Sequence, residues 1–476
     1  MPVVDKRKSF GVRKEGNILA KRKMTQEEKV NYMTTKAVPP LICELAVPTI
    51  ISMLVTAFYN MADTFFVGKI NTQSTAAVGI VFTVMALIQS CGFFFGHGTG
   101  NYISRKLGAR EYKDAEVMAA TGFFLAFICG VVFGILGLIF LDPLAVLLGS
   151  TPTILPYTRE YLRVILIGTP FMMSSFVLNN QLRFQGSASY AMVGIVTGAV
   201  VNIILDPVFI FGFDMGVAGA ALATVLSQVI SFIMLYIGSM RGGNIRIHIK
   251  NFKPSWSNVF EIARGGFPSL CRQGLASVSG IFLNHMAGTY GGASGDAAIA
   301  AMSIVNRVAM FANSALIGFG QGFQPVCGMN YGAKKYERVR EGYWFCVKYA
   351  FVFLVVVAAA GIVFAEPIIT LFRKDDAEVI RIGTLALRLH CAAFPLSSWI
   401  VMCNMMLQSM GRAVRASIVA VARQGLFFIP LIFILPQLFG LFGVQICQMV
   451  SDMGSFALSL PIGLSELKRL RNSEEV

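Results

Sequence analysis

Long apolar segments alternate with short polar connections along most of the chain. Six apolar segments lie at roughly 45–66, 76–100, 117–141, 160–182, 190–213 and 216–240. A polar linker follows at about 241–258, and six more segments lie at roughly 259–288, 297–325, 343–365, 383–410, 414–437 and 440–464. Because about 20 apolar residues are enough for a helix to cross a bilayer, the pattern predicts an all-α integral membrane protein with twelve transmembrane helices.

Composition and charge support a membrane location. Hydrophobic residues make up 55% of the 476 residues and charged residues 14%, against roughly 25% charged residues in soluble domains. The net charge of +15 is also common among nucleic-acid-binding proteins, but the basic residues here gather in the tails and in alternate connections. This distribution marks the cytoplasmic side of a membrane protein. We therefore expect both termini in the cytoplasm, the lipid bilayer as partner, and no nucleic acid.

The basic connections divide the chain into five parts. We expect a basic cytosolic tail at 1–40, a six-helix lobe at 41–240, a cytosolic linker at 241–258, a second six-helix lobe at 259–465 and a cytosolic tail at 466–476. The first 36 residues are basic and polar and lack the apolar core of a signal peptide, so we expect them to be disordered. Between the fourth and fifth spans, Arg183 alone marks the cytoplasmic side.

Motifs of enzyme chemistry are missing from the sequence. It contains no GxxxxGK[ST] phosphate loop, no HExxH motif and no GxSxG motif, and its nine cysteines form no CxxC or His/Cys cluster. We therefore expect neither an enzyme nor a bound cofactor.

The two halves of the chain resemble each other. The segment 108–112 recurs at 332–336, and Asp142-Pro143 recurs as Glu366-Pro367, both at a shift of 224 residues. Near the start of each half, 48–68 matches 268–288. Duplicated halves are a common plan of transporters, so we expect two pseudo-symmetric six-helix lobes. A polar residue that only one lobe carries then needs a reason other than the fold.

Asp63 is such a residue, and it lies deep in the first predicted span. An acidic residue near the middle of a membrane costs about 2.5–3.5 kcal/mol. Its repeat partner is Leu283, so the fold does not require a carboxylate at this position. The alternative is a carboxylate near the helix end that reaches the interface, because Gly68 and Lys69 follow closely.

Asn202 and Asp206 are four residues apart in the fifth span and share one helix face. The aligned segment 425–430 of the second half has neither polar side chain. With Asp63 and with Thr224 in the sixth span, they form a set of oxygen donors suited to Na⁺, and the same carboxylates could instead carry a proton. The alternative is a hydrogen-bond cluster that joins helices without a ligand.

Further polar residues inside the first and fourth spans are Tyr59, Asn179 and Asn180. Met and Phe are abundant, at 23 and 39 residues, and such adaptable side chains suit promiscuous binding, although in membrane helices they more often pack in the core or face lipid. We expect the three polar residues to line a substrate cavity.

In four segments, at 46–68, 103–109, 202–207 and 216–224, the sequence resembles the multidrug and toxic compound extrusion (MATE) family. The resemblance covers nearly all of residues 40–465. It implies two six-helix lobes around a central cavity, and antiport of small organic, often cationic, compounds against Na⁺ or H⁺.

The resemblance also implies roles for single residues. The family's first-lobe ion site uses the positions matched here by Asp63, Asn202, Asp206 and Thr224. Its first helix bends at a proline that Pro48 matches. The NorM-like branch carries acidic residues in spans seven and ten, whereas span ten, at 383–410, has none here. The sequence is therefore similar to the DinF-like branch, which implies coupling in the first half, the plasma (inner) membrane of a prokaryote, and a functional monomer.

Two functions follow as hypotheses. The leading one is a secondary active multidrug efflux transporter. The alternative is a flippase for a lipid-linked precursor, which requires cationic side chains in the cavity to hold a pyrophosphate. Arg307 and Arg423, inside spans of the second half, are the candidates for that role, whereas Arg272 is expected to reach the interface.

Overall fold

The structure is a computed structural model that describes residues 24–374 and 376–474. Its first lobe contains a π-helix, η1, and seven α-helices: α3 (Val38–Val67), α4 (Thr72–Gly108), α5 (Tyr112–Ile139), α6 (Leu141–Leu147), α7 (Leu155–Phe184), α8 (Ala188–Pro207), η1 (Val208–Gly212) and α9 (Gly216–Ser239). The short 3₁₀-helix η2 (Ile249–Asn251) lies in the linker.

The second lobe repeats this order. Its helices are α10 (Trp256–Tyr290), α11 (Gly295–Gly332), α12 (Tyr336–Val363), α13 (Ala365–Phe372), α14 (Ala377–Ser409), α15 (Ala413–Val421), the π-helix η4 (Ala422–Phe428), α16 (Ile429–Phe439) and α17 (Leu441–Asn472), with the 3₁₀-helix η3 (Gly292–Ser294) after α10. Counting α8 with η1, and α15 and η4 with α16, each lobe has six long helices, so the predicted fold class is confirmed.

Matched positions of the two lobes adopt the same local structure. Asp142 and Glu366 are both the second residue of a short helix, α6 or α13. Arg110 and Lys334 both have positive φ, at 61° and 59°, in the tight connection after α4 or α11. Because a left-handed backbone at a non-glycine residue is uncommon, its occurrence at both matched positions supports the repeat inferred from the sequence.

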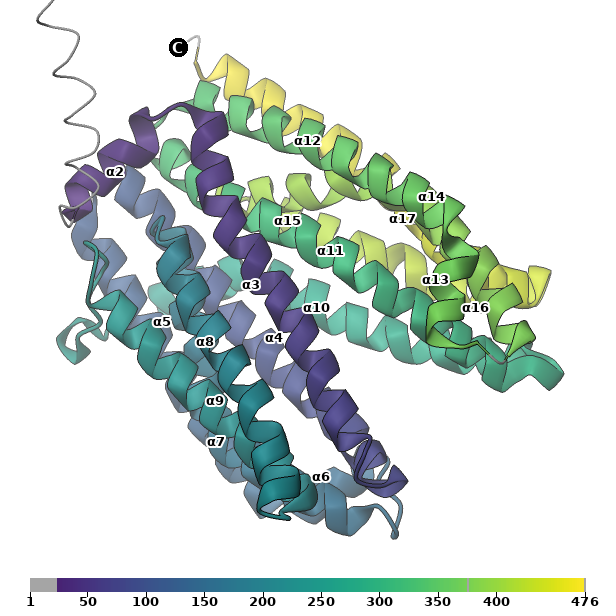
Figure 1. Cartoon of the computed structure of the whole chain (residues 1–476). Coiled ribbons are helices and arrows are strands. Elements are labelled where there is room, and N and C mark those ends of the chain that lie inside the picture. The colour runs from purple at the N-terminus through teal and green to yellow at the C-terminus, as the bar shows by residue number, and fades with distance from the viewer. Residues whose placement is uncertain (1–23, 375, 475–476) are drawn as a thin grey trace, which may run out of the picture.

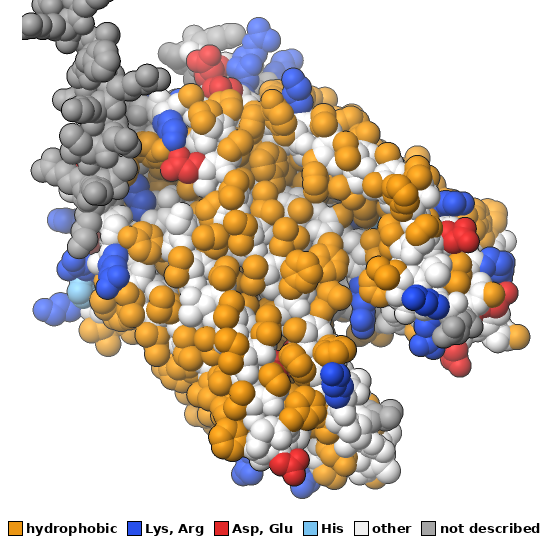
Figure 2. Space-filling view, viewed as in Figure 1, with side chains coloured by type: hydrophobic (Ala, Val, Ile, Leu, Met, Phe, Trp, Pro, Cys, Tyr) orange, Lys and Arg blue, Asp and Glu red, His pale blue; other side chains and the backbone are white. Residues whose placement is uncertain are grey.

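Ten helices of the described chain are long and apolar enough to cross a membrane by length and composition. The two long helices outside this set are α10 and α17, which carry polar residues such as Arg272 and Asp452. Large apolar side chains cover much of the outer surface (Figure 2). This surface is suited to contact with lipid chains.

The two lobes touch at the end that holds the C-terminus and diverge toward the opposite end (Figure 1). Glycines allow this contact. A Cβ atom at Gly322 of α11 would lie 2.5 Å from the Ala46 Cα of α3, and one at Gly98 of α4 would lie 2.3 Å from the carbonyl oxygen of Ile262 on α10. The cleft between the lobes therefore opens away from the termini.

An additional helix, α2 (Gln26–Thr35), lies at the closed end of the cleft (Figure 1). A capping box between Thr25 and Glu28 satisfies two backbone N–H groups at its start. The expectation of disorder is therefore wrong for this part of the N-terminal segment, and residues 1–23 lie outside the described chain.

Helix α2 contacts both lobes. Arg110 of the first lobe donates a hydrogen bond to Asn31 Oδ1 at 3.0 Å, and Asn330 of the second lobe donates one to the Met33 carbonyl at 3.2 Å. Sequence reasoning missed this helix because its apolar side chains are too few to stand out in a basic segment.

The expectation that Arg183 marks a cytoplasmic connection is wrong. Arg183 lies in the last turn of α7, is 1% exposed, and donates to Gln321 of α11 across the lobe interface. Its position in the sequence, one residue before the end of a helix, made a buried cation indistinguishable from a loop cation.

Candidate functional site

A buried polar cluster joins α8 to α9 in the first lobe. Asn202 Nδ2 lies 3.3 Å from Asp206 Oδ1 and 3.5 Å from Thr224 Oγ1, and none of the three residues is more than 2% exposed. The spacing of four residues along α8 directs Asn202 and Asp206 toward the same face, and Thr224 faces them from α9. These three predicted site residues therefore come together.

Asp63 approaches this cluster from α3. It interacts electrostatically with Asp206, and its Oδ1 atom is buried. The predicted depth is wrong, because Asp63 lies four residues before the end of α3, in the half of the helix away from the termini. The side chain nevertheless keeps one oxygen atom inside the lobe and does not turn wholly outward.

The acceptor atoms of the cluster are only partly used. Asp63 Oδ1, Asn202 Oδ1 and Asp206 Oδ2 are buried and accept no hydrogen bond from the described chain. Two carboxylates, an amide oxygen and a hydroxyl form a hard donor set that suits Na⁺, and two neighbouring carboxylates also suit a shared proton. The residues present therefore fit either coupling ion.

Two tyrosines face the carboxylates. Tyr59 of α3 and Tyr161 of α7 both interact electrostatically with Asp63 and Asp206. Tyr161 is fully buried beside Thr224, although its hydroxyl lacks a hydrogen bond of good geometry. Sequence reasoning missed Tyr161, but the repeat held a signal: at the shift of 225 residues that relates this part of the lobes, its partner is the apolar Ala386.

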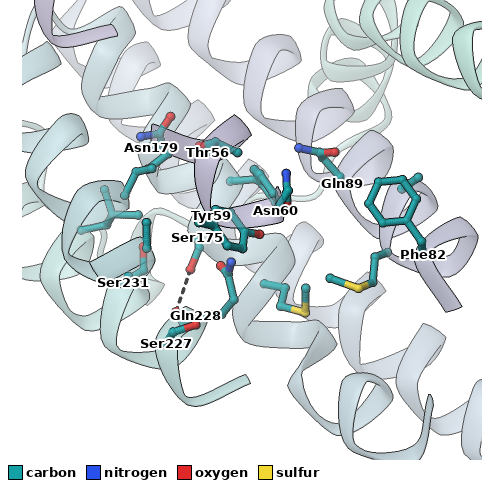
Figure 3. A pocket seen from close by; sticks show the side chains of 18 residues that line it. Thr56, Tyr59, Asn60, Phe82, Gln89, Ser175, Asn179, Ser227, Gln228 and Ser231 are labelled. Carbon is teal, nitrogen blue, oxygen red and sulfur yellow. Dashed lines mark hydrogen bonds between the residues drawn. The ribbon is translucent and has the colours of Figure 1, made fainter. Parts of the chain in front are cut away.

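A pocket with a volume of about 90 Å³ adjoins the cluster through Tyr59 (Figure 3). It lies among α3, α4, α7, α8 and α9, and its polar lining residues are Thr56, Tyr59, Asn60, Gln89, Ser175, Asn179, Ser227, Gln228 and Ser231. Its lining contains no charged side chain. The volume is smaller than the roughly 300–1,000 Å³ of drug-binding pockets, so a larger compound requires movement of the walls.

The predicted cavity residues separate in the structure. Tyr59 and Asn179 line the pocket, and Asn179 Nδ2 also donates to the Ala191 carbonyl at 3.2 Å. Asn180 does not line it, so this prediction is corrected. Because successive residues of a helix point in different directions, Asn180 lies on another face of α7, where its Oδ1 accepts a hydrogen bond from Arg183 at 2.6 Å.

The second lobe holds an ion pair at the corresponding place. Helices α15 and α17 begin 225 residues after α8 and α9, so Arg423 and Asp452 correspond to Gly198 and Ser227, which line the first-lobe pocket. The Arg423 guanidinium donates to both Asp452 oxygen atoms, at 2.7 and 3.1 Å. Sequence reasoning left Arg423 without a carboxylate partner because it did not identify Asp452 as polar in one lobe only.

The two lobes, the polar cluster in one of them and the cleft between them define a membrane transporter rather than an enzyme. The chain belongs to the MatE family, whose sequence profile matches residues 48–208 and 268–434, one segment in each lobe. These two matches support the duplication inferred from the sequence. The DinF-like branch stays a prediction.

Relatives with curated names agree with this family. The chain is 28% identical to "Multidrug export protein MepA" of Staphylococcus haemolyticus (strain JCSC1435), covering 94% of this chain and 97% of the relative. It is 30% identical to the protein of the same name from Staphylococcus aureus (strain NCTC 8325 / PS 47), covering 88% and 92%. A solved structure described as the outward-facing conformation of a multidrug resistance MATE family transporter superposes with a TM-score of 0.86 at 29% identity, covering 92% of this chain and 98% of the other.

Proposed function

We propose that this chain exports small organic compounds, many of them cationic, by antiport against H⁺ or Na⁺. The observation that carries the proposal is the buried cluster of Asp63, Asn202, Asp206 and Thr224 beside an uncharged polar pocket of the same lobe. Relatives named multidrug export proteins support the substrate class. The apolar outer surface and bacterial relatives support the plasma membrane of a prokaryote as its location.

The orientation and assembly state belong to the same proposal. The basic residues at the end with the termini support cytoplasmic termini, so the cleft faces outward in this structure. Both lobes and the whole cluster come from one chain, which supports a functional monomer.

The coupling ion would be held by the two carboxylates, with Asn202 Oδ1 and the Thr224 hydroxyl as neutral donors. An ion or proton at this place supplies a positive charge that neutralises the pair. Asp63 is the member of the cluster on α3, and the same helix contributes Thr56 and Tyr59 to the pocket wall. Neutralising Asp63 thus changes the forces on a helix that shapes the pocket.

Pro48 provides a place for α3 to bend. Thr49 Oγ1 donates to the Gly318 carbonyl of α11 at 2.7 Å, so α3 is anchored to the second lobe directly after the proline. Proline lacks an N–H group and therefore leaves out the helical hydrogen bond to the Glu44 carbonyl. The anchored segment stays in place while the segment beyond it moves, which changes the pocket and expels substrate into the outward-facing cleft.

The energy of the membrane potential suffices for this work. One positive charge that moves down 100 mV contributes about 2.3 kcal/mol. This corresponds to roughly a fifty-fold gradient of a neutral substrate per proton.

The flippase alternative loses its named support. Arg423 is neutralised by Asp452, so its guanidinium is not free to hold a pyrophosphate. Arg307 is exposed on α11 and is paired with no acidic side chain of the described chain. Neither arginine therefore favours that function over export of organic compounds.

Transport in proteoliposomes with independently imposed Na⁺ and pH gradients tests the proposal. We expect accumulation of a fluorescent organic cation to follow one of the two gradients and to disappear in the Asp63→Asn variant. Asp296→Asn, a change at an exposed carboxylate in the first turn of α11, serves as the matched control. Transport that responds to neither gradient, or that survives Asp63→Asn, contradicts the proposal.

A further inference from the structure

Arg183 is a fully buried cation at the interface of the two lobes. It stacks on Phe184 with its guanidinium 5.2 Å from the ring centre. Its Nη atoms donate to Gln321 Oε1, to Asn180 Oδ1 at 2.6 Å and to His97 Nε2 at 3.2 Å. Its Nε atom is buried without a partner in the described chain.

His97 does not neutralise this charge. Its Nδ1 atom lies 3.2 Å from the Phe93 carbonyl and its Nε2 faces a guanidinium donor. An arginine has donors only, so Nε2 accepts and Nδ1 carries the hydrogen atom. The imidazole is therefore neutral, and every acceptor around Arg183 is uncharged.

A second arginine faces the same place from the other lobe. Arg272 of α10 repels Arg183 and His97 electrostatically. Its Nη1 donates to Asn404 Oδ1 at 3.2 Å, again a neutral acceptor, and its side chain is only half-buried. In the described chain, no Asp or Glu forms an ion pair with either arginine.

Elsewhere the protein neutralises its buried charges. The Arg423 guanidinium forms two hydrogen bonds with Asp452, and the buried Glu466 is paired with Arg412 and Arg415. A buried charge without a counter-charge is costly, and two neighbouring cations add mutual repulsion. The exception at Arg183 and Arg272 therefore points to a counter-charge that comes from outside the chain.

We propose that Arg183 and Arg272 bind an oxyanion, a carboxylate or phosphate group, on a molecule that enters between the lobes. The planar guanidinium group matches both anions with paired hydrogen bonds. The half-buried Arg272 makes the first contact, and Arg183 supplies its unpaired Nε when the lobes separate. His97 adjoins Gly98, which touches Ile262 on the other lobe, so lobe movement changes access to this pair.

The oxyanion site goes beyond the proposed export function and is distinct from the first-lobe carboxylate cluster. Arg183 lies near the end of α7 at the closed side of the cleft, whereas Asp63 lies near the opposite end of α3. The anionic group has two possible sources, a soluble phosphate or the headgroup of a lipid. Both share the chemistry that two guanidinium groups recognise.

Thermal unfolding of the full chain in neutral detergent, at constant ionic strength, tests the site. Inorganic pyrophosphate is compared with chloride, and short-chain phosphatidylglycerol with short-chain phosphatidylcholine. We expect Tm to rise saturably with at least one anionic probe. A response to pyrophosphate indicates a soluble anion, and a response to phosphatidylglycerol alone indicates a lipid headgroup.

Arginine variants decide whether the response belongs to this pair. Arg272→Gln is expected to weaken probe affinity by at least about tenfold, and Arg272→Lys by less. Arg307→Gln removes an exposed arginine of α11 and is expected to leave affinity unchanged. The proposal is overturned if no anionic probe raises Tm, or if Arg272→Gln and Arg307→Gln respond alike. Asp63→Asn keeps the anion response, which separates this result from failure of the export function.

Discussion

Asn202 holds one oxygen atom of Asp206 and leaves the other free. The amide nitrogen lies 3.3 Å from Asp206 Oδ1, while Oδ2 is buried and accepts no hydrogen bond from the described chain. The first contact fixes the carboxylate on the α9 side of α8. The second oxygen atom is therefore available to a proton or a cation, together with Asp63 across the helix interface.

Asp63→Asn is expected to abolish coupled export and to leave the fold intact, because the amide keeps the shape of the side chain and removes its charge. The accumulation ratio should fall by the contribution of one charge, about fifty-fold per 100 mV. Transport in proteoliposomes and Tm of the purified variant measure the two effects. An unchanged accumulation ratio at normal Tm contradicts the role of Asp63.

A second carboxylate in the other lobe should not restore coupling. Leu283 is the repeat partner of Asp63 and is 6% exposed. The segment opposite it, 425–430, offers no counterpart of Asn202 or Asp206. The double variant Asp63→Asn with Leu283→Asp is thus expected to remain inactive, and recovery of transport would show that the two lobes are interchangeable.

The repeat explains why much of the cluster was predictable from the sequence. It identified Asp63, Asn202 and Asp206 as polar residues of one lobe only, and the structure brings them together. It did not give their depth, because a hydropathy pattern places a helix end only within a few residues. The predicted depth of Asp63 was wrong for this reason.

Other features needed tertiary structure. Arg183 and Asn180 are close in sequence to residues with different surroundings, and only helix rotation decides which face is buried. Asp452 and Arg423 are 29 residues apart, so their pairing depends on how α17 packs against η4. The α2 helix is stabilised by contacts from both lobes, which a local pattern does not record.

Burial of Lys29 is expected to make α2 docking depend on pH. Lys29 Nζ donates to Ser187 Oγ and, at 2.6 Å, to Asn244 Oδ1. Burial lowers the pKa of this ammonium to about 7, against about 10.4 when α2 is undocked. Between these values the undocked state binds more protons, so docking strengthens as pH rises from 7 and is constant below 7.

The ratio of proteolysis rates between wild type and Lys29→Met measures this effect. The uncharged variant controls for the pH dependence of the protease. We expect the ratio to change by up to about tenfold per pH unit between pH 7 and 9. A ratio that is flat over this range contradicts the effect of burial.

Gly322→Ala is expected to disturb the closed end of the cleft. The new Cβ would lie 2.5 Å from Ala46 Cα, and two helix backbones cannot both keep their positions at this distance. Overpacking of this kind costs about 1–3 kcal/mol, so Tm and transport should both fall. Gly280→Ala is the matched control, because a Cβ there meets nothing within 4 Å. Equal behaviour of the two variants would contradict a close lobe contact at Gly322.

Pro48→Ala is expected to preserve substrate binding and abolish export. Helix α3 is continuous through Pro48 from Val38 to Val67, so the proline does not interrupt the helix in this state and acts only when α3 bends. Alanine supplies the missing N–H group for the Glu44 carbonyl, which stiffens α3 next to its anchor on α11. Tm should therefore stay equal or rise while the transport rate falls.

Pro268→Ala is the control for the hinge, because Pro268 is the repeat partner of Pro48 and lies inside α10. The second lobe lacks the carboxylate cluster, and the ion pair of Arg423 with Asp452 occupies the place of its pocket. Bending of α10 therefore has no coupled charge to drive it, and we expect Pro268→Ala to transport at the normal rate. Substrate binding by fluorescence and export from proteoliposomes separate the two steps. Normal export by Pro48→Ala, or equal loss in both variants, contradicts a hinge that is specific to the first lobe.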